Sequence, residues 1–362
     1  MTTLKRISLV TAILLGVLSN AYAGHDEGKF NASEFTLHHI GDSHEWHLWG
    51  EGEESSHIPL PVILMDGGLQ VFSSSSFNQP HSAEVNGKSL EYLTTSDGKY
   101  AIVHDKIYSA ELGALNFDAE GHPSNNKPLD LSITKNVASM LLSATLLLLL
   151  FIGAANAYKK RGVNSAPKGL QSFLEPLVLF VKDEIAIPNI GEQKYMKFMP
   201  YLLTVFFFIW INNLMGLIPF FPFGANLSGN IAFTMTLAIC TLVITLAMSK
   251  KDYWKHIFMP PVPLALYPIM IPIELIGVIS KPFSLMIRLF ANITAGHIVI
   301  LSFMCIIFMQ KNVAWAGMSV PMALFISVLE LLVAALQAFI FTMLSALFIG
   351  QAMEEHHEEA HH

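Results

Sequence analysis

Polar side chains that carry or exchange charge interrupt the most apolar part of this 362-residue sequence. They are Arg288, Asn292, His297, Glu330 and Gln337. An arginine stays charged at physiological pH, so inside a membrane it needs a partner, water or a route to the interface. A carboxylate and an imidazole at membrane depth are typical of a proton relay. These residue types together indicate ion translocation.

The spacing of these residues predicts how two helices would present them. Arg288 and Asn292 are i and i+4, which places them on one helix face. Glu330 and Gln337 are i and i+7 and share a face of a later helix. If the two helices are antiparallel, Arg288 lies level with Gln337, and His297 lies nearer the level of Glu330. Steps of about 100° per residue turn His297 about 180° away from Arg288, so either His297 serves a water-filled inlet on the other flank or the helix bends.

Simpler roles remain open for the same side chains. Pro282 is the expected start of a helix, and Arg288 follows it by about 9 Å along the axis, close enough for the guanidinium to snorkel to the interface. Each of the other polar residues could be a core residue satisfied by hydrogen bonds.

The composition places these residues in a membrane protein. Hydrophobic residues make up 52% of the chain and charged residues 14%, and the mean hydropathy is +0.48. The net charge of −7 comes from acidic residues in 24–57 and in the last ten positions. No lysine and arginine cluster is large enough to predict a nucleic-acid partner. Cys240 and Cys305 lie in apolar runs, so they are expected in the core and not in a disulfide.

The first 23 residues have the pattern of a signal peptide. Lys5 and Arg6 precede a short apolar run, residues 7–18, and then Ala-Tyr-Ala at 21–23. A first transmembrane helix is the alternative, but the apolar run is shorter than the roughly 20 residues that a span needs. We expect cleavage after Ala23.

Residues 24–130 predict a small β-rich domain, because short segments rich in β-branched and aromatic residues alternate with Gly, Pro, Asn and Asp. Five histidines make a metal site conceivable, but no tight ligand spacing with Cys or Asp supports one. We therefore predict no metal and no cofactor. The histidines are His38, His39, His44, His47 and His57.

Two segments lead from this domain into the membrane. Residues 131–161 contain a long apolar run that ends at Lys159-Lys160-Arg161, which predicts a transmembrane helix with its basic end in the cytoplasm. The β-rich domain would then lie outside the cytoplasm. Residues 168–187 mix apolar and charged side chains and predict an interfacial amphipathic helix.

Residues 197–352 predict a helical membrane core. Spans are expected at about 198–217, 231–248, 283–309 and 319–350, which makes five with the first helix. The last two are long and should be strongly tilted. Prolines at 260, 261, 263, 268, 272 and 282 predict short, broken helices before the fourth span. The acidic, His-rich tail, 353–362, is expected in the cytoplasm. The fold class is thus an all-α polytopic membrane protein with a small β-rich N-terminal domain.

Three segments of this core carry a resemblance to a known family. They are SKPFSLMIRLFANITAGH at 280–297, LQAFIFTMLSALFIG at 336–350 and, more weakly, NNLMGLIPF at 212–220. With these segments the region 168–352 resembles subunit a of bacterial F-type ATP synthases, the rotary machines whose membrane stator borders a ring of c subunits. The β-rich domain looks like an extension that some bacterial members carry.

The resemblance implies roles for individual residues. Arg288 is the essential stator arginine, which faces the carboxylates of the c-ring and separates two offset proton half-channels. Asn292 and Gln337 line the same path, and Glu274 matches an acid of the cytoplasmic half-channel. His297 and Glu330 stand where many bacterial relatives carry Glu and His in that order, which preserves an acid–imidazole pair at the periplasmic inlet. Gly216, in contrast, replaces an acid found there in some relatives.

The resemblance also implies partners and a location. The expected partners are the c-ring proteolipids, subunit b of the peripheral stalk, the F1 sector indirectly, the lipid membrane and the transported protons. The chain would reside in the bacterial inner membrane. It carries no P-loop motif G-x-x-x-x-G-K-[ST], so we predict a non-catalytic subunit without an ATP site.

Other classes of protein fit the sequence less well. Broken helices and ionisable residues near mid-membrane also suit a stand-alone ion-coupled transporter, but five spans do not halve and no internal repeat is visible. A membrane sensor would need a cytoplasmic signalling domain, and the chain ends about ten residues after the last predicted helix. An intramembrane zinc protease would need an H-E-x-x-H motif, which the sequence lacks.

Overall fold

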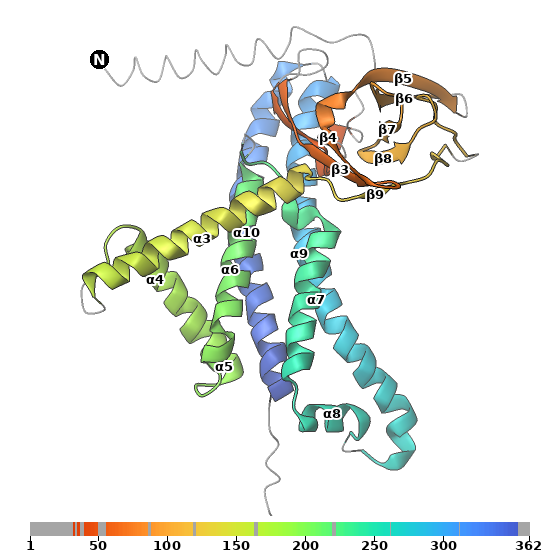
Figure 1. Cartoon of the computed structure of the whole chain (residues 1–362). Helices are drawn as coiled ribbons and strands as arrows, with labels where there is room; N and C mark the ends of the chain where they lie inside the picture. Colours follow the sequence, from red (N-terminus) through yellow and green to blue (C-terminus); the bar gives the residue numbers. More distant parts are fainter. Residues whose placement is uncertain are drawn as a thin grey trace, which may run out of the picture.

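A computed structural model describes most of the chain, and it divides into a β-rich domain and a helical bundle (Figure 1). The described residues are 32, 35, 36 and 40–353, apart from 50–55, 86–87, 119–120, 163–165, 219–221, 261 and 311. The predicted signal peptide, His38 and His39, and nearly all of the acidic tail lie outside the described residues.

Within the described residues, the β-rich domain consists of three antiparallel sheets (Figure 1). In one sheet β1 pairs with β2, the second has the order β4-β3-β9, and the third has the order β5-β6-β7-β8. The strands are β1 (Glu45–Trp49), β2 (Ser56–Pro59), β3 (Pro61–Met65), β4 (Leu69–Ser73), β5 (Phe77–Val85), β6 (Lys88–Thr95), β7 (Tyr100–Val103), β8 (Lys106–Ser109) and β9 (Leu129–Asp130).

Alternation along β3 decides which face of its sheet forms the domain core. Val62 and Leu64 are fully buried and pack with Phe77, Tyr100 and Ile107. The residues between them along β3 point to the opposite side of the sheet. The core of the domain therefore lies between the sheet β4-β3-β9 and the sheet β5-β6-β7-β8.

The helical part contains five helices that are long and apolar enough to cross a membrane, counted over the described residues. They are α3 (Lys135–Arg161), α6 (Tyr195–Leu217), α7 (Ile231–Met248), α9 (Tyr267–Gln310) and α10 (Ala316–Met353). Shorter helical segments connect them: α4 (Leu170–Phe180), a π-helical segment (Val181–Ala186), α5 (Ile187–Ile190) and α8 (Lys251–Phe258). The predicted fold class is confirmed, including two long C-terminal helices.

The long helices do not fit upright in a bilayer. The 44 residues of α9 and the 38 residues of α10 extend about 66 and 57 Å at 1.5 Å per residue, whereas the hydrocarbon core is about 30 Å thick. Both must therefore be strongly inclined if they stay inside it. Figure 1 shows α3 at a wide angle to α9 and α10, so the five helices are not parallel to one another.

The expectation of broken helices in the proline-rich segment is wrong for its C-terminal half. Helix α9 begins at Tyr267 and continues through Pro272 and Pro282. Each internal proline removes one backbone hydrogen bond. In an apolar segment the remaining amides have no better partner than the helix itself, so the helix persists. Pro282 is also buried against the bundle, where packing supports it.

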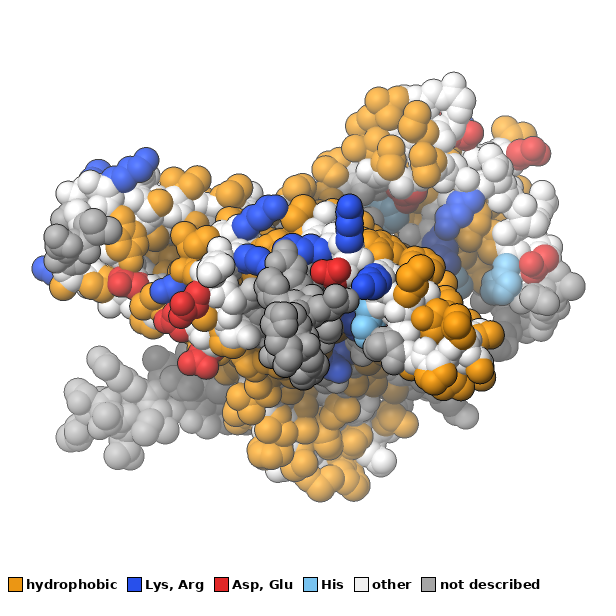
Figure 2. Space-filling model, turned by 90° about the horizontal axis from the view of Figure 1, so that it is seen from below, with side chains coloured by type: hydrophobic (Ala, Val, Ile, Leu, Met, Phe, Trp, Pro, Cys, Tyr) orange, Lys and Arg blue, Asp and Glu red, His pale blue; other side chains and the backbone are white. Residues whose placement is uncertain are grey.

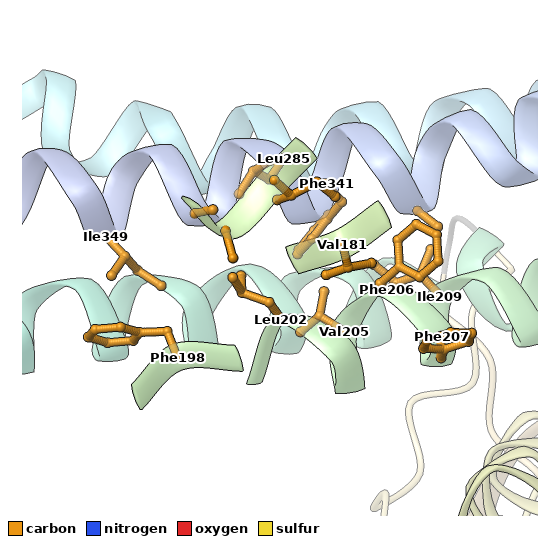
Figure 3. Packing of buried hydrophobic residues seen from close by; sticks show 14 of the residues in the cluster. Val181, Phe198, Leu202, Val205, Phe206, Phe207, Ile209, Leu285, Phe341 and Ile349 are labelled. Carbon is orange, nitrogen blue, oxygen red and sulfur yellow. The ribbon is translucent and has the colours of Figure 1, made fainter. Parts of the chain in front are cut away.

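The core of the bundle lies where α6, α9 and α10 meet the π-helical segment (Figure 3). Figure 3 shows Leu202 and Val205 of α6 close to Leu285 and Phe341, which belong to α9 and α10. Small residues of α10 let the helices approach closely, and Ala334, Ala338 and Ala346 are fully buried. These contacts set the relative level of α9 and α10.

The segment predicted as an interfacial helix, 168–187, is part of this packing. It forms α4, the π-helical segment and α5 without interruption, and its buried side includes Leu174, Val181 and Ile185. A Cβ atom on Gly350 of α10 would collide with the backbone oxygen of Asn189 in α5. The helix therefore packs tightly against the bundle along its C-terminal part.

Candidate functional site

The structure brings His297 of α9 and Glu330 of α10 into contact. The His297 Nδ1 atom lies 3.5 Å from Glu330 Oε1, and the two side chains are 16% and 2% exposed. The pair lies at one level of the bundle, which agrees with the expectation for antiparallel helices. An acid and an imidazole are thus buried together within the membrane-spanning part of the chain.

Two glycines make room for this pair. A Cβ atom on Gly296 would lie 2.7 Å from Glu330 Oε1, so only glycine allows the carboxyl group its place against α9. On the other side, a Cβ atom on Gly216 of α6 would lie 3.7 Å from His297 Nε2 and 3.3 Å from the backbone oxygen of Ala225. The imidazole therefore presents Nδ1 to Glu330 and Nε2 toward α6, so its two ring nitrogens face different helices.

The Glu330 carboxyl group has an unusual environment. Both of its oxygens are buried, and neither accepts or donates a hydrogen bond within the described part of the chain. An ionised carboxylate buried in this way is costly unless a charge compensates it. Either a proton on Glu330 or a proton on His297 supplies the compensation, so the pair is suited to exchange one proton.

A second polar layer, which sequence reasoning did not single out, surrounds the same end of α6. Asn213 donates from Nδ2 to the backbone oxygen of Ala334, 3.3 Å away, and its Oδ1 accepts a 2.5 Å hydrogen bond from Ser228. The neighbouring Asn212 donates to Phe208, and its Oδ1 is buried without a hydrogen-bond partner among the described residues. Two adjacent amides in an apolar span were the available signal, and their contacts one turn from Glu330 extend the polar site.

Arg288 and Asn292 lie on the outer face of α9. Both are exposed in this chain, whereas Leu285, Leu289 and Ile293 face the core. Within the described residues, the Arg288 guanidinium makes no ion pair or hydrogen bond. His297, in contrast, points toward α6 and α10, so the two side chains occupy different flanks, one of the two arrangements that their spacing allows.

Gln337 is buried on α10, on the face that also carries Glu330. It forms no hydrogen bond with Arg288, although the two were expected at similar levels. Arg288 therefore presents its charge outward from the bundle and not into a contact with Gln337.

Glu274 lies near the N-terminal end of α9, far along the helix from His297 and close to basic and aromatic side chains. Its charge interacts with Lys281, which donates a 3.0 Å hydrogen bond to Gln351 and lies over the Phe348 ring. Burial raises the pKa of Tyr253 on α8, and the negative charge of Glu274 raises it further. Glu274 thus belongs to a second polar site, remote along α9 from His297.

A small cavity lies beside this second site. Its volume is about 10 Å³, enough for about one water molecule, and it is lined by Thr241, Leu242, Thr245, Tyr253, Val278, Lys281, Pro282 and Phe348. Hydroxyl groups continue from the cavity into the bundle, since Thr241 Oγ1 lies 2.7 Å from Tyr201 Oη and 3.3 Å from Ser345 Oγ. The sequence carries no signal for this series of hydroxyl groups, because single hydroxyls are common in apolar helices.

Lysines surround the end of the bundle that holds Glu274. Figure 2 shows Lys and Arg side chains gathered at this end, seen from below. Lys194 donates to the backbone oxygen of Met353 at the end of α10, and the Lys250 amide donates to that of Ala352. The charge distribution distinguishes this end from the end with His297 and Glu330.

Comparison with known proteins identifies the helical part of the chain. The profile of the family described as ATP synthase A chain matches residues 137–350, more than half of the chain. The chain belongs to the ATP synthase A chain family. It is therefore a multi-pass membrane subunit of the proton-conducting Fo stator, and it is not the catalytic subunit. The sequence-based prediction of the family and the prediction of a non-catalytic subunit are confirmed.

Curated relatives of the family cover much of the chain. A protein of Prosthecochloris aestuarii named ATP synthase subunit a 2 is 48% identical over 317 residues, which cover 84% of this chain and 94% of the relative. ATP synthase subunit a of Chloroherpeton thalassium is 44% identical over 270 residues, 69% of this chain and 80% of the relative. Subunit a of Myxococcus xanthus is 46% identical over 242 residues, 65% of this chain and 78% of the relative.

The β-rich domain matches a separate family. Residues 35–131 fit the profile of a domain of unknown function (DUF8433). The family of the A chain begins at residue 137, just after this domain ends. The β-rich domain is therefore an addition to the conserved stator core, as the resemblance implied.

Proposed function

We propose that this subunit conducts protons through two offset half-channels that meet at Arg288, where the guanidinium faces the carboxylates of a ring of c subunits. The observation that supports this most is the outward position of Arg288 on α9, with no ion pair or hydrogen bond to any described residue. A permanent cation on an apolar surface inside the membrane requires a partner, and a carboxylate on a neighbouring subunit would supply it.

Electrostatics explains how such a meeting drives rotation. A protonated ring carboxyl is neutral and can face lipid, whereas beside Arg288 its ionised form is favoured, so the proton leaves into one half-channel. The ring carboxylate takes up another proton from the other half-channel after it passes the arginine. The fixed charge of Arg288 also repels protons and so prevents direct leakage. Each charge that crosses gains about 2.3 kcal/mol per 100 mV.

The inlet in this proposal runs past His297 and Glu330. The contact between them and the hydrogen-bonded layer of Asn213 and Ser228 support a proton path at this end of the bundle. Gln337 and Asn292 lie on the faces of α10 and α9 that lead from this pair toward Arg288. The pair would receive protons from the periplasm and pass them to the ring.

The outlet runs past Glu274. Its neighbours Lys281 and Tyr253 border the cavity at the lysine-rich end of the bundle. That end is assigned to the cytoplasm because basic residues flank membrane helices on the cytoplasmic side. The β-rich domain, at the other end of α3 from Lys159 and Lys160, would then be periplasmic, and the C-terminus cytoplasmic. This orientation agrees with a signal peptide at residues 1–23.

The complex proposed for this subunit follows from the same geometry. The c-ring would border the outer face of α9 that carries Arg288, and subunit b would contact the stator elsewhere on its lipid-facing surface. The F1 sector would be reached only indirectly. The expected location is the bacterial inner membrane, with protons as the transported ion and neither cofactor nor metal.

The deciding experiment replaces Arg288 with alanine in the whole ATP synthase. Because Arg288 makes no ion pair or hydrogen bond within the described chain, we expect normal assembly and loss of essentially all proton-driven ATP synthesis in reconstituted vesicles. Ser302→Ala is a matched control on the same helix, since Ser302 is exposed and donates only to the Ile298 carbonyl of its own helix. Synthesis at the control level in Arg288→Ala would refute the proposal.

A second measurement separates the stator from a stand-alone ion-coupled transporter. Purification of this chain from membranes should bring with it a small helical-hairpin proteolipid that carries one membrane carboxylate. Ion uptake by vesicles that contain this chain alone would favour the transporter instead.

A further inference from the structure

The sheet β4-β3-β9 has an outer face that is almost wholly apolar. Met65 pairs with Leu69 on one side and with Leu129 on the other, and Ile63 pairs with Val71, so these side chains share a face. Leu131 and Ile133 continue that face, because their amides donate to the backbone oxygens of Ile63 and Pro61. The outer face is thus formed by Pro61, Ile63, Met65, Leu69, Val71, Ser73, Leu129, Leu131 and Ile133.

This outer face is open in the chain, although its residues are large and hydrophobic. Met65 is 50%, Leu69 64%, Val71 62%, Leu129 60% and Leu131 53% exposed. The opposite face of the same sheet already supplies the domain core through Val62 and Leu64. A contiguous apolar face without a charged side chain is uncommon on a domain surrounded by water and marks a contact with another apolar phase.

The outer face is joined rigidly to the first membrane helix. The strand β9 ends at Asp130, and the segment that follows stays paired with β3 until α3 begins at Lys135. Asp42 accepts hydrogen bonds from the Thr134 hydroxyl, 2.9 Å, and from the Asn136 amide, 3.1 Å. The Lys135 amide donates to the backbone oxygen of Ser43 at 2.9 Å. These bonds hold the domain at the start of the helix instead of leaving it on a loose tether.

The outer face lies close along the chain to the start of α3. Leu131 precedes Lys135 by four residues, about 13 Å of extended chain at 3.3 Å per residue. Beyond it, α3 exposes a series of leucines to its surroundings, among them Leu141, Leu142, Leu148 and Leu149. In Figure 1 the strands β3 and β4 are drawn on the side of the domain that is nearer to the helices.

We propose that the outer face of β4-β3-β9 lies on the outer leaflet of the membrane that α3 crosses. The β-rich domain would then rest on the membrane surface while α3 fixes it to the stator. Lipid is favoured over a protein partner because the face carries no charged side chain and is joined through a short hydrogen-bonded segment to α3, an apolar span that exposes leucines. The proposal depends on α3 as a membrane span and on the orientation proposed above, and it does not depend on the proton path.

Nitroxide labels test this in the intact ATP synthase reconstituted in lipid vesicles. Cys240 and Cys305 are replaced with serine, and Leu69→Cys carries the label on the outer face. Gln70→Cys is the matched control, because Gln70 is exposed and its side chain lies on the opposite face of the same strand. We expect the label at 69 to be several-fold more accessible to oxygen, which dissolves in lipid, than to a water-soluble nickel chelate. The label at 70 should show the reverse preference.

Two outcomes would overturn the proposal. Equal access of the nickel chelate at positions 69 and 70 would place the outer face in water. Shielding of the label at 69 from both reagents, with an immobilised spectrum, would show a protein partner in place of lipid. Leu131→Cys repeats the test nearer to α3 if the label at 69 prevents assembly, and retained ATP synthesis verifies that each labelled complex is folded. The outcome of this labelling experiment does not depend on whether Arg288 has the role proposed above.

Discussion

Among the described residues, two histidine–carboxylate pairs have one partner almost fully buried, and they differ in what surrounds them. In the β-rich domain, His44 Nε2 lies 3.1 Å from Asp130 Oδ2, and the other oxygen of Asp130 accepts the Ser132 amide at 2.9 Å. In the bundle, His297 and Glu330 are 3.5 Å apart, and neither Glu330 oxygen has a hydrogen bond within the described residues. One carboxylate is satisfied and the other is not.

The difference separates a structural pair from one suited to proton exchange. Burial alone would raise the pKa of Asp130, but hydrogen bonds from His44 and Ser132 outweigh it and lower that pKa to about 2. Asp130 therefore stays ionised at neutral pH and holds β9 in place. Glu330 has no hydrogen-bond donor within the described residues, so a negative charge on it would need compensation by a proton on His297. An imidazole and a carboxyl group are thus suited to different roles in the two pairs because their hydrogen-bond surroundings differ.

The largest effect should follow from loss of the exchangeable proton. Glu330→Gln keeps the size of the side chain but cannot take up or release a proton, so we expect proton-driven ATP synthesis to fall at least about tenfold, in the range typical of lost acid–base groups. Asp130→Asn is the matched change in the other pair and should leave proton flux unchanged. Proton flux into vesicles that contain either variant complex is measured with a pH-sensitive dye. Equal flux in both variants would exclude Glu330 from the path.

Exchange of the two partners should be less harmful than loss of either. The double variant His297→Glu with Glu330→His keeps an acid and an imidazole at the same level, although Gly296 is fitted to the carboxyl group on α10. We expect its ATP synthesis to lie between wild type and each single alanine variant. A double variant no better than the worse single variant would mean that the positions, and not the pair, matter.

Crowding of the pair should have a smaller effect. Gly296→Ala places a methyl group 2.7 Å from Glu330 Oε1, so the carboxyl group must shift from its place beside His297. We expect a several-fold decrease in proton flux with normal assembly. Gly277→Ala on the same helix is the control, because a Cβ atom there meets nothing within 4 Å. Similar flux in the two variants would contradict the proposed fit.

The smallest effect on proton flux, and a local effect on stability, should come from Asp130. The pKa of Asp130 is lowered in the folded domain. The ionised carboxylate therefore stabilises the folded domain fully above about pH 4, and this stabilisation is lost as the pH falls toward 2. Asp130→Asn should cost about 1–3 kcal/mol, because it weakens buried hydrogen bonds to a charged group. Hydrogen exchange of the β3 and β9 amides in the whole complex measures this. Unchanged protection in the variant at neutral pH would contradict the assignment.

Much of the architecture was predictable because local sequence carries it. Long apolar runs and basic flanks predict the spans, and a change to short β-rich segments separates residues 24–130 from the bundle. Helix periodicity allowed Arg288 and His297 to lie on two flanks of α9, and the structure decided for this arrangement over a bent helix. The continuity of α9 through Pro272 and Pro282 did not follow, since proline disfavours helices locally and the apolar surroundings override that preference.

Distances across helices were beyond the reach of such patterns. The contact of His297 with Glu330, the space that Gly296 leaves for it, and the hydrogen bond between Asn213 and Ser228 all depend on how α6, α9 and α10 rotate and slide against one another. The sequence by itself determined which side chains are polar within the membrane and which helix face each one occupies. Only the packing of the helices decided which of them meet and which, like Arg288, remain directed outward, because contacts between distant segments are set by the close packing of whole side-chain surfaces.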